Sequence, residues 1–143
     1  MVKAVNILKI ISALCFLSTL LYVYSSLPVM VNLNPDIFDF SIHREYLFYG
    51  LLTGFVVISI FFFALEKMLL PVIKFEELAA WVKGLSPVIN LYLCFLIGYL
   101  AVINNPGHFQ SGSYGYLTYL GPILIAAWLG GLIFLISKSK KTT

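Results

Sequence analysis

The sequence contains few charged residues for its length. Charged residues make up 10% of the 143 positions, whereas hydrophobic residues make up 61%. Soluble domains typically carry about 25% charged and about 45–50% apolar residues, and a chain this short has too little interior to bury the excess. The composition therefore excludes a soluble globular domain. It also excludes a disordered chain, which needs few apolar side chains and many charges.

Clustered basic residues, paired cysteine motifs and catalytic motifs are also missing. The formal net charge is +3, carried mainly by lysines that flank apolar runs, whereas a nucleic-acid-binding surface concentrates Lys and Arg on one face. The chain has no Cys-x-x-Cys, no phosphate loop and no Gly-x-Gly-x-x-Gly. We therefore expect no nucleic-acid partner, no cofactor and no enzymatic activity. The remaining class is an integral membrane protein, whose first partner is the lipid bilayer.

Four apolar runs are long enough to cross a bilayer: residues 6–25, 46–67, 84–104 and 114–137. A helix needs about 20 mostly apolar residues for this, and a helix satisfies its backbone groups internally. The sequence therefore predicts an all-α membrane protein, a four-transmembrane-helix bundle in one domain over residues 1–143. A signal peptide is the alternative for the first run, which follows Lys3. The length of the run and the lack of an Ala-x-Ala site favour a span.

Lysines mark one side of the predicted bundle. They lie before the first run, between the second and third, and after the fourth: Lys3, Lys9, Lys67, Lys74, Lys83, Lys138, Lys140 and Lys141. The opposite side carries a single basic residue, Arg44. Because cytoplasmic segments collect Lys and Arg, we expect both termini to lie in the cytoplasm.

The external loop at residues 26–45 has structure signals of its own. Two short β-prone runs flank an Asn-Pro-Asp turn at 34–36, which predicts a small β-hairpin. We favour a role as a cap on the bundle, because an isolated hairpin is only marginally stable. The alternative is contact with a partner through Phe38, Phe40 and Ile42.

The cytoplasmic loop contains an amphipathic segment at residues 74–83. Phe75, Leu78 and Trp81 fall near one helical face, and charged residues occupy the rest. This pattern predicts a short interfacial helix with its Trp at headgroup level. A tilted extension of the third span is the alternative. The same three side chains are our candidates for docking another subunit.

Small residues recur at helical spacing in the second and fourth runs. The candidates for helix packing are Gly50, Gly54, Ala126, Ala127, Gly130 and Gly131. Small side chains let helix backbones approach closely where lipid supplies no hydrophobic drive. We expect these faces to pack within the bundle; contact with another chain is the alternative.

Ionised side chains are absent from the interiors of the four runs. Proton relays and ion paths usually place such groups inside the spans, so we do not expect an ion-coupled transporter or a pump. The candidate intramembrane polar residues are Asn90 and Thr118. For Asn90 we favour an interhelical hydrogen bond, and Pro122 is expected to kink the fourth span.

Histidines and cysteines are few. His43 and His108 lie in the two external loops and are the candidates for a metal site, although their spacing is not that of a zinc motif. Surface histidines without a ligand are the alternative that we favour. Cys15 and Cys94 lie within spans, and counting from the flanking lysines places them at different depths. A disulfide between them is therefore not expected.

Residues 20–50 resemble parts of known bacterial proteins. The Tyr24-Ser25-Ser26-Leu27-Pro28 run and the following turn resemble small membrane proteins related to the toxin-immunity and signalling family. The 41–46 run resembles short uncharacterised inner-membrane proteins of Bacteroidetes-type bacteria. The loop lacks the His-Phe usual in the immunity family. The resemblance implies a bacterial inner-membrane location and assigns no reaction and no functional residue.

Three functions are compatible with these patterns. The first is a non-catalytic accessory or scaffolding subunit of a larger inner-membrane complex, with other membrane proteins as partners. The second is a small carrier or pore for a neutral or lipophilic solute, built on Pro122 and a polar line of Thr53, Asn90 and Thr118. The third is a membrane enzyme acting at the outer face, with these candidate residues: His43, Arg44, Glu45 and His108. We favour the first, because small-residue faces and aromatic surfaces are plentiful and catalytic motifs are lacking.

Overall fold

A computed structural model describes residues 2–34, 38–105 and 116–141 of the chain. These residues form five helices and one pair of strands. In chain order they are α1 (Val2–Ser26), β1 (Met30–Asn34), β2 (Phe38–His43), α2 (Arg44–Leu69), α3 (Glu76–Lys83), α4 (Leu85–Asn104) and α5 (Leu117–Lys141).

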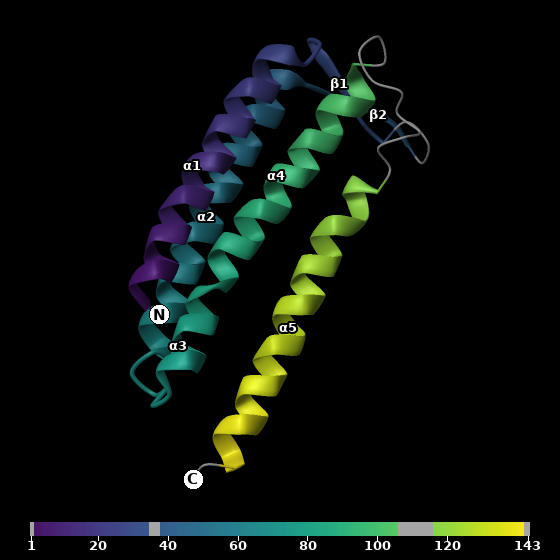
Figure 1. The fold of residues 1–143 in the computed structure, drawn as a ribbon. Helices are drawn as coiled ribbons and strands as arrows, with labels where there is room; N and C mark the ends of the chain where they lie inside the picture. Colours follow the sequence, from purple (N-terminus) through teal and green to yellow (C-terminus); the bar gives the residue numbers. More distant parts are fainter. Residues whose placement is uncertain (1, 35–37, 106–115, 142–143) are drawn as a thin grey trace.

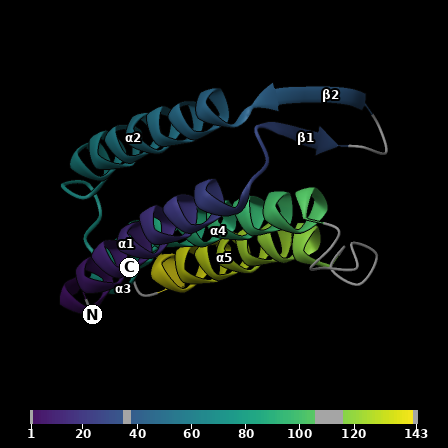
Figure 2. The same cartoon turned by 90° about the horizontal axis from the view of Figure 1, so that it is seen from above.

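Three of the long helices lie side by side in one layer, and the fourth covers one face of it. Helix α4 lies between α1 and α5, and α2 runs along the face next to α1 (Figures 1 and 2). Helix α3 lies at the end of the layer where α1 begins and α5 ends, and the hairpin lies at the other end (Figure 1). The first and the last described helical residues therefore both lie at the α3 end.

Four helical segments are long and apolar enough to cross a membrane: Lys3–Ser26, Arg44–Leu69, Glu76–Asn104 and Tyr119–Lys138. The prediction of four such helices is confirmed, and the helices extend past the predicted spans mainly at the α3 end. The start of the fourth predicted span, up to residue 115, lies outside the described residues.

The predicted amphipathic helix is present and begins at Glu76 instead of residue 74. It meets α4 at Gly84, whose φ of −66° and ψ of −15° are helical. The Gly84 N–H donates to the Ala80 carbonyl at 3.0 Å, so the backbone bonds continue through the junction. Helix α3 is therefore joined to α4 without a break in the backbone hydrogen bonds, which favours the alternative of an extension of the third span.

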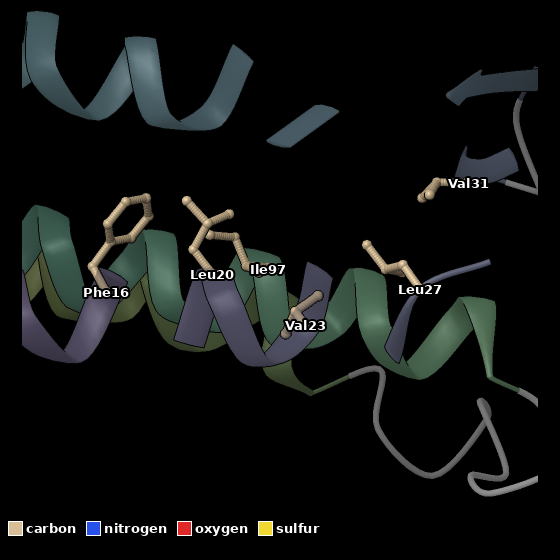
Figure 3. Close-up of a cluster of buried hydrophobic side chains, with 6 residues drawn as sticks. All are labelled: Phe16, Leu20, Val23, Leu27, Val31 and Ile97. Carbon is tan, nitrogen blue, oxygen red and sulfur yellow. The ribbon is translucent and has the colours of Figure 1, made fainter. Parts of the chain in front are cut away.

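The buried core lies between α1, α4 and β1, beneath α2. Figure 3 shows its side chains, which are Phe16, Leu20, Val23, Leu27, Val31 and Ile97. Helix α2 covers this cluster with half-buried side chains, and the Phe55 ring stacks on Phe16 with 4.5 Å between centroids. No residue of α2 is itself buried.

The predicted hairpin is confirmed, with its turn at 35–37 outside the described residues. The strands are antiparallel, pairing Met30 with His43 and Val31 with Ile42. Val31 is fully buried, which ties the hairpin to the core. On the free edge of β1, the Asn104 side chain accepts from Asn32 N–H at 2.7 Å and donates to Asn32 O at 2.9 Å. These contacts fit a cap on this end of the helix layer.

Candidate functional site

Helices α3 and α5 are joined by a reciprocal pair of tryptophans. Trp81 Nε1 donates to the Trp128 carbonyl at 2.9 Å, and Trp128 Nε1 donates to the Trp81 carbonyl at 3.0 Å. A Cβ placed on Gly131 would lie 2.2 Å from Trp81 Cζ2. Gly131, one of the candidates for helix packing, therefore lies directly against the Trp81 ring. The Trp81 indole, which the sequence suggested for docking another subunit, contacts α5 of the same chain.

The remaining members of the predicted docking face differ in exposure. Phe75 precedes α3 and is exposed, whereas Leu78 is half-buried. The exposed ion pair Lys138–Glu77, at 3.0 Å, adds a further contact between α5 and α3. The α3 segment therefore serves mainly as an internal contact.

A second close contact between an aromatic ring and a glycine joins α4 and α5. A Cβ on Gly121 would lie 1.7 Å from Tyr92 Cδ2, so the tyrosine ring occupies the space that a side chain would need. The sequence pattern of paired small residues at helical spacing did not include this glycine. The Gly121-Pro122 step was the available signal. Helix α5 runs on through Pro122.

The other predicted packing glycines are uncovered. Among the described residues, a Cβ on Gly50, Gly54 or Gly130 would meet nothing within 4 Å, and the neighbouring alanines of α5 are exposed: Ala126 and Ala127. The expectation that these residues build the bundle is therefore wrong for the single chain. In α2 the reason is the rotation of the helix about its own axis. Phe55 faces the core, so Gly50 and Gly54 face away from it.

Asn90 forms the interhelical hydrogen bond that the sequence predicts. It is buried, and its Nδ2 donates to the Ser12 hydroxyl of α1 at 3.1 Å. Thr53 is exposed on α2, and the Thr118 side chain lies outside the described part of the chain. Thr53 and Asn90 therefore do not form the polar line that a carrier would need.

An ion pair that the sequence did not suggest joins the α3 ends of α1 and α2. Lys9 Nζ lies 2.5 Å from Glu66 Oε1, and the two side chains are 25% and 13% exposed. The partners are separated by 57 positions in the chain, so no local pattern links them.

The two cysteines are free but lie close together. The Cys94 thiol lies near the side chains of Cys15 and Thr19. The predicted difference in depth is therefore wrong. The count began at Lys9, which lies within α1 and pairs with Glu66, instead of at the helix start near Val2.

The residues proposed for an outer-face site make local contacts instead. His43 Nδ1 accepts from the Glu45 backbone N–H at 3.4 Å and so caps α2, and Glu45 is exposed. Arg44 Nη1 donates to the Leu27 carbonyl at 3.3 Å. His108 lies outside the described residues. Within the described ranges, no group of three or more His, Cys, Asp or Glu side chains is placed to hold a metal ion.

These elements define a mainly α-helical protein with four helices long and apolar enough to span a membrane and a small antiparallel hairpin at one end. No protein-family model, no curated protein and no solved structure matches the chain. Every functional proposal below therefore rests on this chain's own residues.

Proposed function

We propose that the protein is a non-catalytic, multi-pass membrane protein that acts as an accessory or scaffolding subunit. In this proposal, α2 binds a helix of another membrane protein in a larger complex. The observation that carries the proposal is the uncovered small-residue face of α2, which contains Gly50 and Gly54.

This face is continuous along α2. Tyr46, Gly50, Gly54, Val57 and Phe61 follow one another at steps of three or four residues, so they share one side of the helix. The three large side chains among them are all exposed. A groove of two glycines between large apolar side chains is the geometry in which a second helix backbone approaches closely.

The contrast with two glycines of α5 supports this assignment. At Gly121 and Gly131, aromatic rings of the same chain occupy the space beside the glycine. At Gly50 and Gly54, no part of the described chain does. Glycine costs about 1 kcal/mol relative to alanine in a helix interior, so we infer that a partner outside the chain compensates for it.

The location is part of the same proposal. The lysines of the described helices gather at the α3 end, and the lone arginine lies at the hairpin end. We place the α3 end in the cytoplasm and the hairpin outside, in a bacterial inner membrane.

The test is purification from native membranes in a mild detergent, with mass spectrometry and native electrophoresis. The wild type should carry a stoichiometric membrane partner. The double variant Gly50→Leu/Gly54→Leu should lose it, because the added side chains fill the groove. The matched control is Gly130→Leu, which places the same side chain at an uncovered glycine of α5 and should keep the partner.

Two outcomes would reject the assignment. A wild-type protein that runs alone rejects the subunit role, and a protein that forms only a dimer with itself rejects membership of a larger complex. Retention of the partner by the folded double variant would show that α2 is not the contact surface.

A further inference from the structure

Arg44 is the sequence's one arginine, and it lies at the start of α2 beside the hairpin. Its backbone N–H donates to the Val29 carbonyl at 2.9 Å. Its guanidinium lies over the Tyr24 ring, 5.3 Å from the centroid, and Nη1 donates to the Leu27 carbonyl at 3.3 Å. These contacts from α1 and the following segment hold the side chain in one place.

The same guanidinium has an unused donor. Arg44 Nε is buried and has no hydrogen-bond partner among the described residues. The ion pairs of the described chain, Lys9–Glu66 and Lys138–Glu77, do not include Arg44. A buried donor on a cation is costly when it is left unpaired. A negatively charged group near the guanidinium would therefore stabilise this site.

Apolar side chains from three helices form a narrow crevice that Arg44 also lines. Its walls include Leu20 and Val23 of α1, Leu51 of α2 and Ile97 of α4. The crevice therefore brings the Arg44 side chain next to an apolar wall, in helices of membrane-spanning length. A headgroup with an attached hydrocarbon chain has the same division of chemistry.

We propose that Arg44 binds the phosphate of an anionic phospholipid, whose first chain carbons lie along the mouth of this crevice. Arginine suits the task because its planar guanidinium can donate two parallel hydrogen bonds to a phosphate. The Tyr24 ring holds the guanidinium beside α1 through a cation–π contact. The lipid is an anionic one because the choline of a zwitterionic headgroup would bring a positive charge close to Arg44.

A wild-type measurement tests this without any substitution. Labelling arginine with nitrogen-15 gives a single Nε–H signal, since the chain has one arginine. In micelles, adding phosphatidylglycerol should shift this signal and slow its exchange with water. Phosphatidylcholine and inorganic phosphate should each leave it unchanged at the same concentration. If phosphatidylglycerol leaves the Nε–H signal unchanged, the proposal is wrong. If inorganic phosphate shifts the signal equally, the ligand is not a lipid.

Variants give the second arm, read as lipid retained by delipidated protein in native mass spectrometry. Arg44→Gln should weaken phosphatidylglycerol binding by about ten-fold or more, as expected when charge-assisted hydrogen bonds are lost. Arg44→Lys keeps the charge without the planar guanidinium and should bind at an intermediate level. Lys74→Gln removes an exposed cation elsewhere and should bind like the wild type. Equal binding by folded Arg44→Gln and wild type would overturn the site.

Discussion

The tryptophan pair between α3 and α5 gives the sharpest test of the packing, through Gly131→Ala. The added methyl would lie 2.2 Å from Trp81 Cζ2, whereas carbon atoms in contact are about 3.5–4.0 Å apart. The indole must therefore move by more than about 1 Å. That movement breaks the hydrogen bond from Trp81 Nε1 to the Trp128 carbonyl, which is now 2.9 Å long, because such bonds weaken beyond about 3.2 Å.

The expected loss follows from these two effects. This hydrogen bond contributes about 0.5–1.5 kcal/mol, and overpacking typically costs about 1–3 kcal/mol. Against this, replacing a helical glycine by alanine gains up to about 1 kcal/mol. We expect Gly131→Ala to lower the free energy of unfolding by about 1–3 kcal/mol. Gly130→Ala, whose Cβ meets nothing within 4 Å, should leave it unchanged or raise it slightly.

Reversible unfolding in mixed micelles, followed by tryptophan fluorescence, measures both variants. The chain has two tryptophans, and both are in this contact, so the signal reports on it directly. If Gly131→Ala is as stable as Gly130→Ala, and its indole emission is that of the wild type, the Trp81 ring does not lie against Gly131.

Three further predictions concern polar contacts. Ser12→Ala should destabilise the bundle by about 1 kcal/mol, because Asn90 loses its hydrogen-bond partner. The coupling between the two side chains is measured by unfolding Ser12→Ala, Asn90→Ala and the double variant. Asn104→Ala should speed amide exchange in β1 by about ten-fold, as the loss of hydrogen bonds worth about 0.5–1.5 kcal/mol each implies, with exchange in the helices unchanged. Lys9→Gln and Glu66→Gln should each cost about 1 kcal/mol, since the pair is only partly shielded from water, and the charge-reversed double variant should recover most of the loss in the same assay.

Hydropathy and turn chemistry were enough to predict the elements of the fold. Four long apolar runs predicted four long helices, and the Asn-Pro-Asp turn predicted a hairpin; the structure contains both. The amphipathic pattern likewise located α3 to within two residues of its start. These features depend on composition within a short window, so the sequence displays them directly.

The rotation of the helices could not be predicted in the same way. Every side of α2 is apolar, so the sequence does not indicate whether Gly50 or Phe55 faces the core. In α5 the same ambiguity made Gly130 and Gly131 equivalent candidates, although only Gly131 meets an aromatic ring. Lys9 was misleading for a related reason, because a lysine paired with a carboxylate does not mark the end of a helix.

Helix α2 is the element on which both proposals converge, because it is the long helix with two different apolar sides. One side lies over the core through Phe55, and Arg44, at the start of the helix, lines the crevice. The other side presents Gly50 and Gly54. Lipid at Arg44 and a partner helix on the glycine face would thus contact α2 from different directions. Arg44→Gln should therefore leave partner binding intact, and Gly50→Leu should leave the Arg44 signal intact.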